Sequence, residues 1–413
     1  MQPAERALAG GGTPSARQER SWIFSLLIAP EAVISIGLID GALSYLLRNE
    51  GVDPARAASI VALLSLPHAI YFLWGPVTDF FVRRRTWLLL AAALAALTLL
   101  LAFHEPRLSS TRGVAMLFIA ASIGVVVPAA CGGIMGTLRS EVSRRRAGSF
   151  YQVGSLTFGA ITTFLVVSYS GRLSLFALGC MIAALVALPA LTAFAMPAQP
   201  VLSESARATA LRIWREFKST FLRWEAIPYT LLITFPMCSG GMLGLLPELA
   251  RDYDVGGSAV AWINGAAGAL LTTLGALAVP LIPVRVRASV AYLVAGLANA
   301  VALAILAIGP LRPAVYYTGT VLFLFTIGAC YALFTGVALE FLGISGKSGS
   351  SRYSIINSIG NLPVAYMAWV DGRGYAHWGP RGMPAADAVL SAAGAALLLA
   401  HFLFSRRTPA ADH

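Results

Sequence analysis

Charged residues are scarce in this 413-residue chain, which has only 12% Asp, Glu, Lys and Arg and a mean hydropathy of +0.74. A soluble domain carries about 25% charged residues, so this chain has too few to cover a water-exposed surface. Long apolar runs recur along the whole sequence, and each can supply the roughly 20 residues that cross a bilayer as a helix. The composition excludes a soluble domain and predicts a polytopic α-helical membrane protein.

Cysteine and histidine are also rare, with four and five residues respectively. The cysteines fall inside apolar stretches, which indicates small buried side chains rather than disulfides or metal ligands. The histidines are scattered without paired metal-ligand spacing, and no phosphate-binding loop is present. We therefore expect no cofactor, no metal site and no direct use of ATP.

Twelve apolar runs are long enough to span a bilayer. They cover residues 22–47, 57–80, 87–103, 114–138, 149–169, 173–195, 227–246, 260–279, 290–308, 315–342, 354–370 and 385–404. Shifting the sequence by two hundred residues places Gly275 on Gly75 and Arg285 on Arg85, a weak internal repeat. The expected fold is an all-α membrane protein with twelve transmembrane helices in two six-helix pseudo-repeats.

Five segments follow from this division. They are an N-terminal tail at 1–21, a first half at 22–195, a linker at 196–226, a second half at 227–404 and a C-terminal tail at 405–413. The tails, the linker and every second loop hold 21 of the 30 Lys and Arg residues. Basic loops stay in the cytoplasm, so both termini are predicted to be cytoplasmic. The net charge of +11 thus belongs to one membrane face and does not indicate nucleic acid.

The linker contains apolar residues at helical spacing with charged residues between them. The apolar positions are Leu211, Trp214, Phe217 and Phe221. This pattern is typical of a helix that lies flat on the membrane surface. It is either a plain interfacial connector or a regulatory, lipid-sensing element.

A loop motif follows the second predicted helix, where residues 75–85 read GPVTDFFVRRR. It resembles the G-x-x-x-D-[RK]-x-G-[RK]-[RK] loop between helices two and three of the major facilitator superfamily. The matching residues are Gly75, Asp79, Arg83 and Arg84. Phe80 stands where a basic residue is usual and Val82 where glycine is usual, so the match is partial.

The resemblance implies a conformational latch at this loop. In the superfamily the acid helps to hold the outward-facing state by contacting the partner half. Carried over, Asp79 meets the start of helix eleven near residues 351–354, Arg139 is its charge partner, and Arg85 extends the basic end of the motif. The alternative is that glycine, acid and arginines only anchor the loop in the cytoplasm.

Two longer strings, LWGPVTDFFVRRRTW at 73–87 and TLRSEVSRRRAG at 137–148, are similar to the AmpG-like peptide and acetyl-coenzyme A transporter branch. The resemblance implies a monomeric protein of the bacterial inner membrane. Members of that branch import muropeptides, move acetyl-coenzyme A or take up siderophores. The strings do not select one of these cargoes.

Ionisable residues inside predicted spans are functional candidates, because charge in the bilayer is costly. Glu31 and His68 lie at similar depths, roughly 14 Å and 18 Å into helices one and two at 1.5 Å per residue. They can carry a coupling proton or form a structural hydrogen-bonded pair. Asp40, nine residues after Glu31, points the opposite way on a straight helix unless Pro30 or Gly37 bends it.

Six neutral polar residues are candidates for solute contact. They are Tyr151, Gln152, Asn264, Tyr331, Asn357 and Asn361. Hydrogen bonds between helices are the competing explanation for each. The sequence Gly-Asn-Leu-Pro at 360–363 predicts a weakened helix eleven, and Glu340 is expected to form an interfacial salt bridge, for which Arg352 is a candidate partner.

These features favour a secondary transporter that alternates access between its halves and imports a small organic solute with protons. An exporter of drugs or metabolites with the same fold would look alike at this level. An integral membrane transferase would need a catalytic constellation near a membrane face, and none appears. We therefore expect a carrier of small molecules rather than an enzyme.

Overall fold

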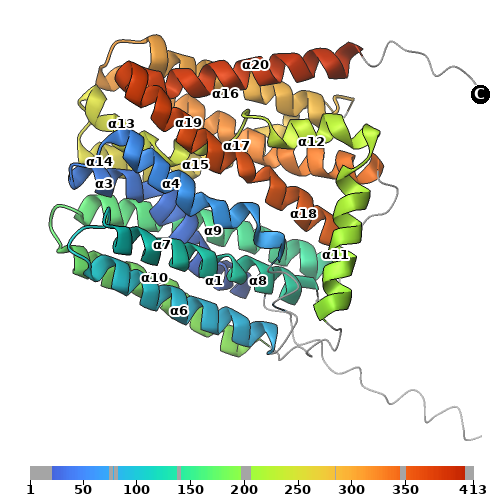
Figure 1. Ribbon diagram of the computed structural model, residues 1–413, viewed down its shortest axis with the longest axis horizontal. Coiled ribbons are helices and arrows are strands. Elements are labelled where there is room, and N and C mark those ends of the chain that lie inside the picture. The colour runs from blue at the N-terminus through green and yellow to red at the C-terminus, as the bar shows by residue number, and fades with distance from the viewer. Residues whose placement is uncertain are drawn as a thin grey trace, which may run out of the picture.

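A computed structural model of the chain describes residues 21–73, 78, 82–136, 141–196, 206–283, 285–344 and 350–404. Within these ranges the regular elements are helices, and no strand is present. Figure 1 shows a bundle of roughly aligned helices, with α11 (Ala206–Phe221) lying across one end of it. The predicted all-α fold is confirmed.

Six helical segments form the first half, coloured blue to green in Figure 1. Helix one consists of α1 (Ile23–Leu27), α2 (Ala29–Ala32), the π-helix η2 (Val33–Leu43) and α3 (Ser44–Asn49). Helices two to six are α4 (Pro54–Ala69) with η3 (Tyr71–Leu73), α6 (Arg84–His104), α7 (Thr111–Gly124) with α8 (Val126–Gly136), α9 (Glu141–Tyr169), and α10 (Leu175–Ala190) with η4 (Leu191–Ala195). The side chains of Asp53, Ser110 and Ser174 accept main-chain N–H bonds where α4, α7 and α10 begin, so capping fixes these starts.

The second half follows α11 and is coloured yellow to red. Helix seven consists of η5 (Trp224–Ala226), α12 (Ile227–Thr234), η6 (Gly241–Gly244), α13 (Leu246–Leu249) and η7 (Ala250–Tyr253). Helices eight to ten are α14 (Gly257–Val260) with the π-helix η8 (Ala261–Ala266), α15 (Ala267–Ala278) and η9 (Val279–Leu281); α16 (Ala288–Ile308); and α17 (Pro313–Ile344). Helix eleven is α18 (Ser350–Gly360) with α19 (Leu362–Trp378), and η10 (Gly379–Arg381) leads to helix twelve, α20 (Gly382–Phe404).

Ten stretches of the described chain are long and apolar enough to cross a membrane. One of them, Ile355–Phe402, contains both helix eleven and helix twelve, and helix seven is missing because it is divided into short pieces. Counting these helices separately gives the twelve spans of the predicted fold. The protein is a multi-pass membrane protein.

Helix seven was expected to be continuous over residues 227–246, and this prediction is wrong. Its first part ends at Thr234, and the chain is not helical again until Gly241. Pro236 forces the preceding Phe235 into an extended conformation with ψ of 158°. Cys238 and Gly240 then adopt positive φ values of 54° and 75°. The break is therefore a defined turn and not a frayed helix end.

Helices eleven and twelve also differ from their expected limits of 354–370 and 385–404. Helix eleven extends to Trp378 and helix twelve begins at Gly382, so only three residues connect them. Asp371 and Asp387 therefore lie inside helices instead of at their edges. The predicted weak point of helix eleven is confirmed, because α18 ends at Gly360 and α19 begins at Leu362.

The two halves pack against each other most extensively along three pairs of elements. The pairs are α4 with α19, η2 with η6, and α9 with η8. Within the first half, Thr163 of α9 donates a 3.1 Å hydrogen bond to the carbonyl oxygen of Gly37 in η2, because the two glycines Gly37 and Gly41 let helix five approach closely. We name the bundle end where α11 lies the linker end, and the other the opposite end (Figure 1).

The predicted linker helix is present as α11 and packs against α18 of the second half. Leu211 and Trp214 are exposed, whereas Phe221 packs edge-on against Phe341 of α17. Trp214 stacks on Phe217. One apolar side of α11 thus remains uncovered by protein, as expected for a helix at a membrane surface.

Candidate functional site

The acid and imidazole that the sequence singled out are in contact. Glu31 Oε1 of helix one and His68 Nε2 of helix two lie 3.2 Å apart. Both side chains are mostly buried, with 13% and 19% exposed respectively. The contact between them therefore lies in the interior of the bundle. The predicted contact between Glu31 and His68 is therefore present.

Asp40 belongs to the same group because helix one is π-helical. A π-helix turns by only roughly 80° per residue, so η2 brings Asp40 back to within roughly 50° of Glu31 around the helix axis. Asp40 is close enough to interact electrostatically with both Glu31 and His68. The straight α-helix on which Asp40 would point away from Glu31 is thus not present, because residues 33–43, which include Gly37, are π-helical.

Two of the predicted tyrosines lie within electrostatic range of this acidic group. Tyr151 of helix five interacts electrostatically with Glu31, and Tyr331 of helix ten with Asp40. Tyr331 lies in the second half and its side chain is 45% exposed, although it is near the middle of α17. Glu31, Asp40, His68, Tyr151 and Tyr331 are hereafter the central cluster, to which both halves contribute.

Helix two and helix eleven meet beside the central cluster at points where both helices are interrupted. Asn361, between α18 and α19, donates a 3.5 Å hydrogen bond to the main-chain oxygen of His68. One turn earlier, Asn357 donates to the Tyr71 hydroxyl at 3.2 Å, and Ser358 Oγ accepts from the Phe72 main-chain N–H at 2.9 Å. Main-chain groups freed at the end of α4 are thus satisfied by side chains of the opposite half.

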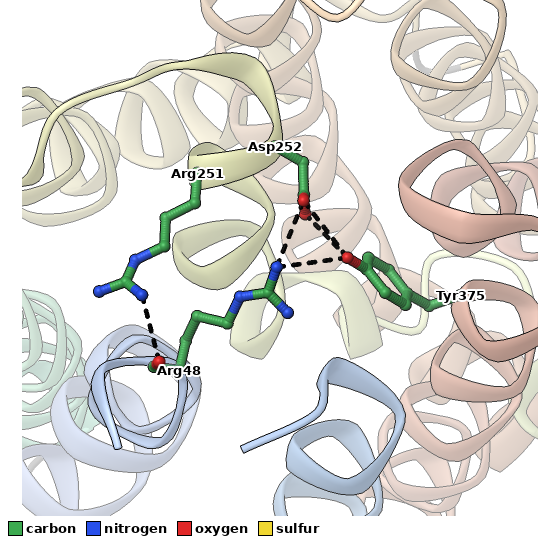
Figure 2. Close-up of polar contacts among 4 residues, drawn as sticks. All are labelled: Arg48, Arg251, Asp252 and Tyr375. Carbon is green, nitrogen blue, oxygen red and sulfur yellow. Dashed lines mark hydrogen bonds and ion pairs between the residues drawn. The ribbon is translucent and has the colours of Figure 1, made fainter. Parts of the chain in front are cut away.

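A second set of polar contacts joins the halves at the opposite end (Figure 2). Arg48, at the end of helix one, donates to Asp252 Oδ1 at 3.3 Å and to the Tyr375 hydroxyl at 3.4 Å. The Tyr375 hydroxyl itself lies 3.3 Å from both oxygens of Asp252. Arg251 donates back to the main-chain oxygen of Arg48 at 3.1 Å and to the Asn49 side chain. These residues form the opposite-end cluster.

Burial shapes the electrostatics of the opposite-end cluster. The Asp252 carboxylate is partly buried, and the Arg48 guanidinium beside it balances its charge. Glu248, one turn earlier, is 1% exposed, and neither of its carboxylate oxygens has a hydrogen-bond partner in the described part of the chain. Sequence reasoning missed this cluster because Arg48 and Arg251 were counted only as loop charges. The sequence signal that could have indicated the cluster is that each half has an arginine, Arg48 or Arg251, shortly after a predicted helix end.

The predicted latch falls largely outside the described residues. Gly75, Asp79 and Arg139 are not among them. Arg84 donates to the Gly133 oxygen at 2.7 Å and Arg85 to the Met196 oxygen at 3.1 Å. These bonds tie helix three to helix four and to the first residue of the linker. Arg83 is exposed at the start of α6.

The remaining candidates for solute contact are Gln152 and Asn264. Gln152 is exposed on α9. Asn264, in the π-helix of helix eight, donates to the Tyr316 hydroxyl at 3.0 Å, and Tyr316 donates in turn to the Leu246 oxygen. That is the interhelical hydrogen bonding given above as the alternative to solute contact. It links helices seven, eight and ten within the second half.

Glu340 forms an interfacial ion pair as expected, and its described partner is Arg287, at 3.9 Å. The side chain of Arg352 lies outside the described part of the structure. Glu340 also accepts a 2.6 Å hydrogen bond from the Ala288 main-chain N–H at the start of α16. It therefore holds the end of helix ten against the positive end of helix nine.

Solved structures share this architecture at low sequence identity. A nucleoside transporter, NupG, has a TM-score of 0.67 and 15% identity, covering 94% of this chain and 99% of its own. A D-xylose-proton symporter has a TM-score of 0.66 and 16% identity, with 92% and 95% covered. A POT family transporter in complex with a thioalcohol-conjugated peptide has a TM-score of 0.71 and 11% identity, with 95% and 96% covered.

No curated protein sequence matches the chain. The sequence model of the Major Facilitator Superfamily, in contrast, matches residues 32–367. The match spans the first eleven helices, from α2 into α19. With the twelve-helix fold and the contacts between its halves, this match shows that the chain belongs to the Major Facilitator Superfamily.

Proposed function

We propose that this protein is a secondary active transporter that imports a small organic solute together with protons. The supporting observation is the contact between Glu31 and His68. The main-chain oxygen of His68 also accepts a hydrogen bond from Asn361 of the opposite half. Family membership favours transport over the transferase considered above. The proposed mechanism is alternating access, in which the two halves rock about a solute held between them.

The central cluster suits proton coupling because the Glu31–His68 pair is negative without a proton and neutral with one. A carboxylate beside an imidazole can share one proton, and a second proton makes the pair cationic. Asp40 provides a further acid within electrostatic range. Proton uptake at Glu31–His68 would alter the field felt by Asp40 and by any solute beside Tyr331.

The link from protonation to movement runs through helix two. His68 lies one residue after Pro67, in the last turn of α4, and its main-chain oxygen accepts from Asn361 of helix eleven. A shift of the His68 ring toward or away from Glu31 moves a main-chain group that the second half also holds. Bonds to groups freed at a helix end can be exchanged without unwinding a complete helix.

We assign the proposed roles as follows. Proton coupling belongs to Glu31, His68 and Asp40. Solute contact belongs to Tyr151, Tyr331, Asn357 and Asn361, while Gln152 and Asn264 are the weaker candidates because of their positions. The loop residues Gly75, Asp79, Arg83, Arg84, Arg85 and Arg139 remain the proposed latch at the linker end.

The opposite-end cluster supplies a matching device at the other mouth. It ties the end of helix one to helices seven and eleven, so it must open if solute is to enter from that end. We place the linker end in the cytoplasm of the bacterial inner membrane, as the basic loops predict. The opposite-end cluster then closes the outer mouth. The functional unit is proposed to be a monomer in the lipid bilayer.

The cargo is proposed to be muropeptide-like or siderophore-like, following the AmpG-like resemblance of the two strings. Tyrosine hydroxyls and asparagine amides between the halves suit a polar solute with several hydrogen-bonding groups. The similar structures are described as transporters of nucleosides, xylose and peptides, which shows how many solutes one fold serves. An exporter remains the alternative function.

The experiment is uptake by purified protein in liposomes with an imposed pH gradient. Radiolabelled anhydro-muropeptide and a ferric siderophore are the first solutes, and pyranine inside the liposomes reports proton entry. Accumulation of one solute with simultaneous internal acidification supports the proposal. Solute movement without proton movement would remove proton coupling, and expulsion of solute against proton entry would make the protein an exporter.

A further inference from the structure

Within the second half, where helix seven is broken, several acceptor oxygens lie together with few hydrogen-bond donors. Ser391 of helix twelve has its hydroxyl 2.6 Å from Asp387 Oδ1 and 2.8 Å from the main-chain oxygen of Pro236. A hydroxyl carries one proton and can donate it to only one of these acceptors. One of the two oxygens therefore lacks a donor within this group.

Asp371 adds two further oxygens without donors. Its side chain is 0% exposed, and neither carboxylate oxygen has a hydrogen-bond partner among the described residues. Asp371 interacts electrostatically with Asp387, which is itself 3% exposed. These two buried acids belong to helices α19 and α20, which pack against each other, and no basic group of the described chain forms an ion pair with either of them.

The helix faces direct both acids toward the break in helix seven. Asp387, Ser391 and Gly394 lie on one face of α20, and Gly394 packs against Phe235 and Pro236. On helix eleven, Met367 lies one turn before Asp371 and packs against Gly241, immediately after the break. Asp371 and Asp387 lie at similar depths, roughly 10 Å and 8 Å from the short connection between their helices at 1.5 Å per residue.

A buried carboxylate without a partner costs several kcal/mol, and neutralisation by a bound cation removes that cost. Protonation would remove the charge of Asp371 but would give it a hydroxyl that also has no partner. A cation instead satisfies several oxygens at once. Membrane transporters hold sodium with carboxylates and with the main-chain oxygens that are freed where a helix is interrupted.

We propose that Asp371, Asp387, Ser391 and the Pro236 main-chain oxygen form a binding site for a sodium-sized monovalent cation. The site is separate from the Glu31–His68 pair, which belongs to the other half. No group of three or more His, Cys, Asp or Glu able to hold a metal is present among the described residues. The small number of carboxylates here accords with a monovalent rather than a divalent ion.

The test is the thermal stability of the purified full-length protein in detergent at fixed pH. Sodium chloride is titrated against choline chloride at constant ionic strength, and the melting temperature is followed. A ligand that binds only the folded state raises the melting temperature in a saturable way, here by about 2–4 °C. Equilibrium dialysis with radioactive sodium measures occupancy, which is expected to be one ion per chain.

Asp371→Asn and Asp387→Asn are expected to abolish the sodium-dependent rise and to weaken sodium binding at least about tenfold. Both remove a buried charge, so neither should lower the melting temperature in choline. Ser391→Ala keeps both acids and is expected to reduce affinity with a smaller shift. Glu248→Gln is the matched control, because Glu248 is also a buried acid without a partner among the described residues but lies outside the proposed site, in helix seven. This substitution should leave the sodium effect intact.

Equal melting temperatures of the wild type in sodium and choline would overturn the site, since the acids would then be neutralised by protons. A full sodium effect in both aspartate variants would overturn it as well. Neither measurement involves solute transport. A failure here is therefore distinguishable from a failure of the proposed proton-coupled import.

Discussion

Arg48 and Asp252, 204 positions apart in the chain, join the two halves through a 3.3 Å contact at the end opposite the linker. Tyr375 of helix eleven bonds to both of them, so three helices meet in this cluster (Figure 2). Their separation is a necessary step if the halves are to part at this end. The strength of this contact thus helps to set how often the opposite mouth opens.

Asp252→Asn is expected to shift the equilibrium toward an open opposite end. A hydrogen bond to a charged group contributes about 1.5–3 kcal/mol, so the open population should rise about tenfold or more. Spin labels at Arg107 and Arg312, both exposed in loops at this end of the two halves, would report longer distances. The labels are introduced in a Cys180→Ser background, because the other three cysteines are buried.

Asp254→Asn is the control for this measurement. Asp254 is exposed two residues beyond Asp252, and its positive φ of 57° is one that asparagine tolerates. It should leave the distance distribution unchanged. If Asp252→Asn also leaves it unchanged, the opposite-end cluster does not hold the halves together.

Glu31→Gln and His68→Gln are expected to uncouple solute movement from protons. Each substitution fixes one member of the pair in a state that no longer titrates, so accumulation driven by a pH gradient should fall at least about tenfold. Exchange of labelled for unlabelled solute needs no net proton movement and should persist. His104→Gln, at the exposed end of helix three, is the matched control and should behave as wild type in both assays.

Asn357→Ala and Tyr71→Phe together test whether Asn357 contacts solute or only its partner helix. Each removes one side of the 3.2 Å hydrogen bond between helices eleven and two. If Asn357 acts only through Tyr71, the changes in solute KM are non-additive in the double variant, because the same bond cannot be lost twice. Additive changes would instead support a separate contact of Asn357 with solute.

Glu340→Gln is expected to destabilise the second half without altering solute affinity. It removes the charge that accepts the 2.6 Å bond at the start of α16 and pairs with Arg287. The expected loss is about 1–2 kcal/mol of unfolding free energy, seen as a lower melting temperature in detergent. Glu225→Gln, exposed in η5 at the start of helix seven, should show no such loss. A changed KM with normal stability would contradict this structural role.

The contact between Glu31 and His68 was predictable because it depends on two local quantities. Counting residues from each helix end gave their depths, and consecutive helices joined by a short loop are neighbours. The break at Asn361 was equally local, since Gly360 and Pro363 both weaken a helix. In contrast, the return of Asp40 to the Glu31 side needed the π-helical winding of η2, for which the sequence carries no simple pattern.

The sequence by itself determined that the chain crosses the membrane repeatedly, because hydrophobicity sums over some 20 neighbouring residues and needs no knowledge of packing. Tertiary structure decided which polar groups meet. Arg48 finds Tyr375 across 327 positions, and Asp387 reaches Pro236 through Ser391. Such contacts depend on the rotation and interruption of each helix against its neighbours. A break such as that in helix seven exposes main-chain groups that only the folded bundle can satisfy.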